Sequence, residues 1–327
     1  MAEGERRDEG FPRMGRKMEK GRSSSSNRND WYATFKRDFL AGGLMAGVAH
    51  TIVAPIERTK VLLQTQESNI AILGGGHRRF KGMFDCIFRI VKEEGILSLW
   101  RGNGISVLRH YPSLALNFSL KDLYRNMLRS GNEDSFLFGP SANFIAGALA
   151  GCTSLVVVYP LDIAHTRLAA DIGKTKARQF RGTYHFLTTI HKADGIRGIY
   201  RGLPASLQGI IVHRGIYFGA FDTMKERMFN GPEVALWKRY AGAQAVSTSA
   251  GLISYPLDTV RRRMMMQSGL EKPMYKSTFD CWRKIYRTEG VASFYRGAVS
   301  SVFRSTGNAA ILVLYDEVKR FINWGGL

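Results

Sequence analysis

The chain has 327 residues, 45% of them hydrophobic, and its 47 Lys and Arg against 27 Asp and Glu give a formal charge of +20. Such a charge favours an acidic partner: nucleic acid, an anionic lipid surface or a polyanionic small molecule. Three scattered cysteines exclude a disulfide framework and a zinc site, and we expect no metal site. No stretch offers roughly 18 uninterrupted apolar residues, so hydropathy alone identifies no transmembrane helix.

The first 30 residues differ from the rest of the chain. They mix basic and acidic residues with a serine run and lack an apolar core. We predict that residues 1–30 form a disordered tail, because such a composition cannot bury enough apolar surface. Its acidic residues argue against a transit peptide, and the missing apolar core argues against a signal peptide.

Three short motifs then recur in the same order three times. A Pro-x-acid-x-x-base motif starts at Pro55, Pro160 and Pro256. The aromatic-Arg-Gly motifs are Trp100-Arg101-Gly102, Tyr200-Arg201-Gly202 and Tyr295-Arg296-Gly297. The third set is Phe80-Lys81-Gly82, Phe180-Arg181-Gly182 and the imperfect Tyr275-Lys276-Ser277. A period of about 100 residues exceeds that of solenoid repeats. We therefore predict three modules, at 31–131, 132–231 and 232–327.

Each module predicts a long helix, a short helix and a second long helix. The expected ranges are 35–66, 82–93 and 104–129; 139–171, 182–192 and 204–228; and 236–266, 278–288 and 298–322. The long segments suffice to cross a hydrocarbon core of ~30 Å with tilt. Small residues at positions such as Gly147 and Gly151 suit close helix contact. The predicted fold is an all-α membrane protein with six transmembrane helices and three short surface helices around a central cavity.

Basic residues inside apolar helices indicate what the cavity holds. Arg109, Lys121, Arg214 and Arg304 each lie in a mostly apolar stretch. A cation at mid-membrane costs at least ~2.5–3.5 kcal/mol, so it persists where it faces water or pairs with another charge. We therefore expect a polar, net-positive cavity that binds an anion.

The acid and the base of each Pro motif predict a gate. In threefold arrangement, the acid of one helix can meet the base of the next and close a ring. The members are Glu57/Lys60, Asp162/His165 and Asp258/Arg261. A second ring is predicted on the second long helix of each module, from Asp122/Arg125, Asp222/Lys225 and Asp316/Lys319. Two rings at opposite ends of one cavity would permit alternating access.

These motifs resemble the mitochondrial carrier family over residues 35 to 322. The run Arg261-Arg262-Arg263-Met264-Met265-Met266, directly after the third Pro motif, looks like the signature of the ADP/ATP carriers. The segments Thr65–Ile70 and Tyr159–Arg167 are most similar to a plant branch assigned to the plasma membrane. The resemblance implies one-for-one exchange of ADP and ATP by a functional monomer through a single central site. The family's usual location is the mitochondrial inner membrane, with the plasma membrane as the alternative.

The resemblance also implies roles for particular residues. Substrate contacts would be Arg109, Asn117, Gly209, Ile210, Ser254 and Arg304, with Arg214 at a further polar cavity position. Cardiolipin or another anionic phospholipid would bind, as a structural lipid, at Gly82, Gly182, Trp100-Arg101-Gly102, Tyr200-Arg201-Gly202 and Tyr295-Arg296-Gly297. Helix N-termini facing the phosphate would supply the attraction.

Three histidines depart from the family pattern. His50 stands where the family has a substrate-contacting lysine, His165 replaces a gate base, and His213 replaces a tyrosine beside the adenine. Unperturbed imidazole titrates near ~6.5, so His50 would attract phosphate weakly at neutral pH and His165 would make its gate pair pH-sensitive.

Other classes of protein fit less well. Gly173-Lys174-Thr175 resembles the end of a phosphate-binding loop. Such a loop also requires a glycine five residues before Gly173, and this position is Leu168, so an ATP-using enzyme is disfavoured. A nucleic-acid binder would carry its basic residues on an exposed face, not in Gly-rich apolar helices. A carrier of another adenine nucleotide or organic anion, or a proton leak, remains the alternative within transport.

Overall fold

The computed structural model describes residues 46–74, 78–129, 140–173, 179–228 and 236–307. Across these ranges the secondary structure is helical, with no strand. One segment of the described chain, Asn143–Ala170, is long and apolar enough to cross a membrane. The predicted tail, residues 1–30, lies outside the described ranges.

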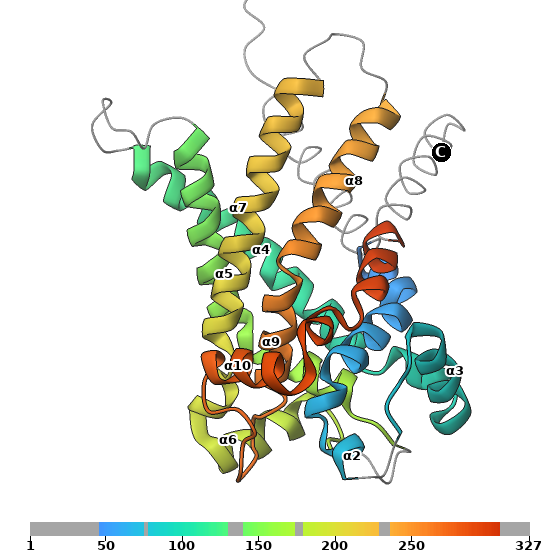
Figure 1. Ribbon diagram of the computed structural model, residues 1–327. Helices are drawn as coiled ribbons and strands as arrows, with labels where there is room; N and C mark the ends of the chain where they lie inside the picture. The colour runs from blue at the N-terminus through green and yellow to red at the C-terminus, as the bar shows by residue number, and fades with distance from the viewer. Residues whose placement is uncertain (1–45, 75–77, 130–139, 174–178, 229–235, 308–327) are drawn as a thin grey trace, which may run out of the picture. The chain divides into compact units, whose positions relative to one another are not determined.

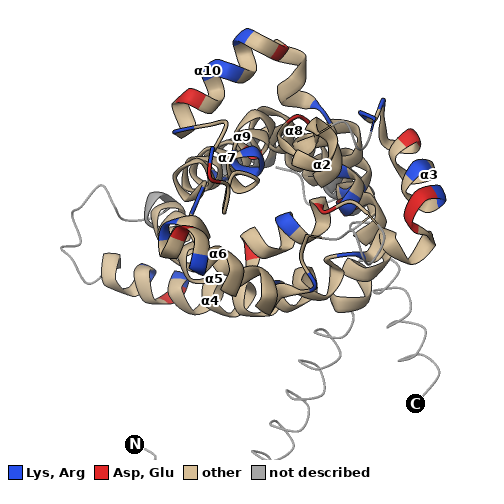
Figure 2. Ribbon diagram, turned by 90° about the horizontal axis from the view of Figure 1, so that it is seen from below, with Lys and Arg blue, Asp and Glu red and all other residues tan. Residues whose placement is uncertain are grey.

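The helices follow the predicted threefold order. The first module holds a helix over 46–65, η1 Gln66–Ser68, α2 Ile70–Leu73, α3 Met83–Glu94, η2 Ile96–Trp100 and α4 Asn103–Arg129. The second holds α5 Pro140–Ala170, α6 Thr183–Ile199 and α7 Leu203–Met228. The third holds α8 Leu236–Ile253, α9 Tyr255–Met265, α10 Thr278–Glu289, η3 Val291–Tyr295 and a helix over 298–307. The short helices α3, α6 and α10 gather at one end of the long ones (Figure 1), and the long helices encircle a common axis (Figure 2).

One predicted helix is interrupted, and one short helix ends close to where it was expected to end. The segment expected at 236–266 divides into α8 and α9 at Ser254, because Pro256 stands in the first turn of α9 and has no N–H to donate. Within α6, Gly195 has φ 63°, so the regular helix ends there, close to the predicted boundary at 192.

The aromatic-Arg-Gly motif forms a corner at the start of the second long helix of each module. Gly202 has φ 88°, in the left-handed region that favours glycine. A Cβ on Gly202 would lie 3.2 Å from the carbonyl oxygen of Arg261. The corner therefore brings α7 against the third Pro motif, and glycine is required both for conformation and for space.

Buried side chains concentrate at the end that carries the short helices. Met264, Met265 and Met266 are each buried, and each joins a different hydrophobic cluster. Met266 packs with Val61, Ala169 and Ala170, which come from the other two modules. We call these four residues the apolar plug. The signature methionines thus help to join the three modules.

Two cysteines belong to this packing. Cys86 and Cys281 are free, fully buried and part of equivalent clusters on α3 and α10. Burial raises the pKa of the Cys86 thiol and of the Cys281 thiol to about 12. Both groups are therefore protonated, unreactive thiols at neutral pH.

Candidate functional site

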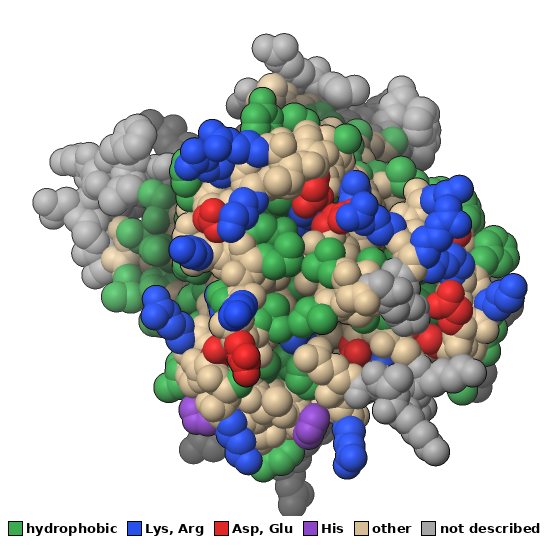
Figure 3. Space-filling model, turned by 60° about the horizontal axis from the view of Figure 1, so that its bottom comes forward, with side chains coloured by type: hydrophobic (Ala, Val, Ile, Leu, Met, Phe, Trp, Pro, Cys, Tyr) green, Lys and Arg blue, Asp and Glu red, His purple; other side chains and the backbone are tan. Residues whose placement is uncertain are grey.

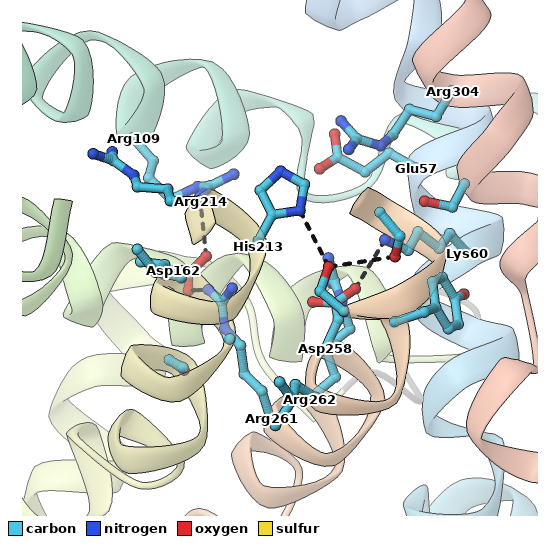
Figure 4. Close-up of a pocket in the computed structure, with 18 residues that line it drawn as sticks. Glu57, Lys60, Arg109, Asp162, His213, Arg214, Asp258, Arg261, Arg262 and Arg304 are labelled. Carbon is cyan, nitrogen blue, oxygen red and sulfur yellow. Dashed lines mark hydrogen bonds and ion pairs between the residues drawn. The ribbon is translucent and has the colours of Figure 1, made fainter. Parts of the chain in front are cut away.

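A cavity of about 350 Å³ lies between the long helices above the Pro motifs. Its volume lies in the range of small-molecule sites. Figure 4 shows charged side chains from several helices converging on it. It is lined by Glu57, Lys60, Arg109, Asp162, Ser206, Gly209, Ile210, His213, Arg214, Gly251, Ser254, Tyr255, Leu257, Asp258, Arg261, Arg262, Ser301 and Arg304. Six of these residues are Lys or Arg and three are Asp or Glu, so the lining has a net positive charge.

The acids and bases of the Pro motifs form a closed ring at the floor of this cavity. Lys60 Nζ lies 2.9 Å from Asp258 Oδ2, and Arg261 pairs with Asp162. The third contact, between Glu57 and His165, is longer at 4.0 Å and joins two charges only when the imidazole is protonated. Every pair links different modules, as the threefold argument predicted.

The ring is reinforced unevenly. The Gln64 side chain donates to Asp258 Oδ2 at 3.2 Å and to Thr259 Oγ1 at 3.3 Å. The positions equivalent to Gln64 in the other modules are Ala169 and Met265, which offer no such donor. Of the three contacts, the Lys60–Asp258 pair is therefore the one that this amide supports.

The three consecutive arginines of the signature, Arg261, Arg262 and Arg263, each make a different kind of contact. Arg261 belongs to the ring, and Arg262 Nε lies 3.4 Å from Asp258 Oδ1 at the cavity floor. Arg263 is fully buried and donates to Glu289 at 2.8 Å, which ties α9 to the end of α10. The triplet thus combines gate, cavity and framework contacts in one helical turn.

Arg109 lies in the cavity but is already paired. Its Nη1 lies 3.1 Å from Asp162 Oδ1, so Asp162 is shared between Arg109 and Arg261. The sequence did not indicate this pairing of an expected substrate residue with a gate acid. An incoming phosphate must compete with Asp162 for this guanidinium.

Arg214 is held differently, by neutral groups. Its guanidinium donates to the backbone carbonyl of Gly147 and, at 3.0 Å, to Asn117 Oδ1. A Cβ on Gly151 would lie 2.6 Å from Arg214 Cζ. The small residues of α5 therefore make room for this side chain of α7. Asn117 contacts Arg214 but does not itself line the cavity.

The expected nucleotide contacts come from α7 and from the break between α8 and α9. Gly209, Ile210, His213 and Ser254 all line the cavity. His213 Nδ1 lies 3.1 Å from Ser254 Oγ, and Ser254 Oγ donates to the Ala250 carbonyl at 2.7 Å. Since that hydroxyl proton is engaged, Nδ1 carries the proton in the neutral ring and Nε2 is left as an acceptor.

The remaining expected cavity residues lie at different places. Arg304 lines the cavity near Glu57 (Figure 4). His50 does not line this cavity and contacts His110, for which the sequence predicted no role. Lys121 is exposed on α4, away from the cavity floor.

The second predicted gate is only partly described. Asp122 and Arg125 are exposed, and neither forms an ion pair with another described residue. The side chains of Asp222 and Lys225, and the whole of Asp316 and Lys319, lie outside what the structure describes. This gate stays a prediction.

The aromatic-Arg-Gly arginines turn toward the protein. Arg101 pairs with Asp171, Arg201 Nη1 donates to the Gln267 carbonyl at 3.1 Å, and Arg296 pairs with Glu67. Each contact joins one module to the next. The aromatic members also pack inward: Trp100 donates to the Thr51 carbonyl, Tyr200 stacks on Tyr159, and Tyr295 stacks on Tyr255.

A groove of about 460 Å³ nevertheless lies where a lipid was expected. It runs between the start of α3 and the start of the helix over 298–307, and Lys81, Gly82, Arg296, Gly297 and Ser300 line it. Basic side chains also surround this end of the molecule, with acidic ones among them (Figure 3).

Comparison with known proteins agrees with this geometry. The family model described as mitochondrial carrier protein matches residues 32–132, 138–232 and 232–325. A probable ADP,ATP carrier protein of Arabidopsis thaliana is 73% identical over 90% of this chain and 91% of its own length. ADP/ATP translocase 4 of Mus musculus is 51% identical (89% and 91% covered), and ADP/ATP translocase 2 of Bos taurus is 49% identical (89% and 99% covered).

Proposed function

Because the chain belongs to the mitochondrial carrier family, we propose that it exchanges ADP for ATP, one for one, through the central cavity. The protein is a transporter and not an enzyme. The observation that carries the proposal is the set of three arginines, Arg109, Arg214 and Arg304, that line a cavity closed by an ion-pair ring. Relatives named as ADP/ATP carriers or translocases support the choice of nucleotide.

The arginines divide the work of binding the phosphates. Arg214 is held by a carbonyl and an amide, and no carboxylate among the described residues pairs with it, so its charge is available to an anion. Arg109 must be drawn from Asp162. A nucleotide that takes Arg109 removes one of the two arginines that hold Asp162, and so favours opening of the ring. Opening then follows from the preference of the nucleotide for the state in which the ring is weakened.

The adenine ring would lie along the part of the cavity wall formed by Gly209 and Ile210. Glycine leaves room for an aromatic ring to approach the helix, and His213 Nε2 offers an acceptor to an exocyclic amine. The arrangement requires no metal for binding, since guanidinium groups pair directly with phosphate oxygens. We propose that free ADP and ATP, not their magnesium complexes, are the substrates.

Exchange in liposomes tests the proposal. Purified protein should take up labelled ADP only when the liposomes contain ADP or ATP, and Arg304→Ala should abolish uptake. Lys272→Ala, on an exposed turn, is the matched loss of a positive charge away from the cavity. Uptake into empty liposomes, or only against AMP or phosphate, would refute strict ADP/ATP exchange.

We also propose the membrane context. The chain acts as a membrane-embedded monomer, in the mitochondrial inner membrane by family default or in the plasma membrane as the alternative. An anionic phospholipid would bind in the groove between Gly82 and Gly297, where the start of α3 faces the groove. Organelle fractionation distinguishes the two membranes, and replacing cardiolipin with phosphatidylcholine during purification tests whether the lipid stabilises the protein.

A further inference from the structure

Two imidazole rings from different helices meet in the first module. The ring centroids of His50, on the helix over 46–65, and His110, on α4, are 4.3 Å apart, with their planes at 58°. Both residues are partly exposed. Two protonated rings would repel each other at this distance, so the contact favours at least one neutral imidazole, the form that binds a metal ion.

The helices that carry the pair are fixed on both sides of it. Toward the short helices, Trp100 Nε1 donates to the Thr51 carbonyl at 2.8 Å and Asn103 Nδ2 donates to Thr51 Oγ1 at 3.0 Å. Toward the other end, Tyr111 packs so closely that a Cβ on Gly47 would lie 2.9 Å from its hydroxyl. The imidazoles therefore stand in a preformed seam, which reduces the ordering needed to bind a ligand.

Charged residues near the two histidines include one that would attract a bound cation and others that would repel it. Glu57 lies seven residues beyond His50 and therefore on the same helix face, and its ring partner is an imidazole instead of a permanent cation. Arg109, next to His110, opposes a bound cation, but Asp162 lies 3.1 Å from it and offsets its charge. Arg304 is the other nearby cation that lines the cavity.

We propose that His50 and His110 together bind a divalent transition-metal ion, with Zn²⁺ as the representative case. Imidazole nitrogen is a preferred ligand of zinc, copper and nickel. No group of three or more His, Cys, Asp and Glu ligands occurs in the described part of the chain, so water completes the coordination. The sequence could not indicate the site, because the two histidines lie far apart along the chain.

Metal binding at this seam would inhibit transport. The same two helices carry Glu57 and Arg109, and both residues belong to the closed network at the cavity floor. A metal that ties the helices together holds these groups in place and opposes opening of the ring. This consequence rests on the proposed exchange function, whereas metal binding itself does not.

Direct binding is the first test. Protein purified without a polyhistidine tag is titrated with Zn²⁺ against a chromogenic chelator. His110→Phe and His50→Gln should each weaken the site by at least about tenfold, since even outer-shell changes at metal sites cost 10–100-fold. His191→Asn, an exposed histidine on α6, is the control and should bind as the unmodified protein does. Unchanged zinc affinity in both pair variants overturns the proposal.

Transport gives the second test. Zn²⁺ should inhibit ADP/ATP exchange by the unmodified protein and by His191→Asn, and exchange by His110→Phe should resist it. If the unmodified protein binds zinc through this pair but exchanges no nucleotide, the proposed function fails and the metal site stands. If zinc inhibits His110→Phe at the same concentration as the unmodified protein, the inhibitory role of the site is wrong.

Discussion

Replacing His165 with arginine should strengthen the ring at the cavity floor. In the unmodified protein, His165 Nε2 lies 4.0 Å from Glu57 Oε1, and both residues are buried. A neutral imidazole gives this contact little electrostatic attraction. Arginine would supply a permanent charge, so all three contacts of the ring would become full ion pairs.

The magnitude follows from the distance. Two unit charges about 4 Å apart attract by about 4 kcal/mol at an effective dielectric constant of 20. Burial of the new guanidinium offsets part of this gain, while the Glu57 carboxylate is already buried in the unmodified protein. We expect a net gain of about 1–2 kcal/mol, a factor of roughly 5–30 in the equilibrium between closed and open rings.

Exchange rates at pH 8 provide the assay. His165→Arg should exchange ADP for ATP roughly 5–30 times more slowly than the unmodified protein at this pH. His165→Gln carries no charge and should exchange as fast as the unmodified protein. Equal rates for His165→Arg and the unmodified protein would contradict the electrostatic account of the ring.

Two further predictions concern packing. Gly151→Ala should raise the KM for ADP by roughly tenfold or more, because the new methyl group displaces the Arg214 guanidinium from its hydrogen bonds; Gly147→Ala, whose Cβ would meet Arg214 at an ordinary 3.6 Å, should change it little, and equal effects of both would refute this account. Cys86 and Cys281 should resist N-ethylmaleimide at pH 8, since their thiols have pKa values of about 12, and should react after unfolding in detergent. Mass spectrometry identifies which cysteine is labelled, and rapid labelling of either one in the folded protein would contradict this account.

The threefold pattern of the sequence predicted most of the helices and the pairing within the ring. A repeated motif must occupy equivalent positions, so the acid of one module could be matched with the base of the next without coordinates. The break at Ser254 was not predicted, because a proline motif alone does not indicate whether a helix bends or stops.

Contacts that do not follow from the repeated motifs could not be predicted from the sequence. The contact of His50 with His110 joins two residues whose counterparts in the other modules are not histidines, and the repeated motifs do not pair Arg109 with Asp162. Arg214 illustrates the same limit, since its place against Gly151 depends on how α5 and α7 cross. Such contacts depend on helix rotation, which hydrophobic and small-residue patterns specify only coarsely.

The apolar plug has an electrical consequence. Val61, Ala169, Ala170 and Met266 are nearly inaccessible to solvent and lie where the three modules meet. With water filling the cavity on one side, a membrane voltage would fall mainly across the ring and this plug. A nucleotide entering the cavity would cross little of that voltage, at ~2.3 kcal/mol per charge per 100 mV. Voltage should therefore act on the step in which the gate changes state, and leave nucleotide binding from the open side nearly unaffected.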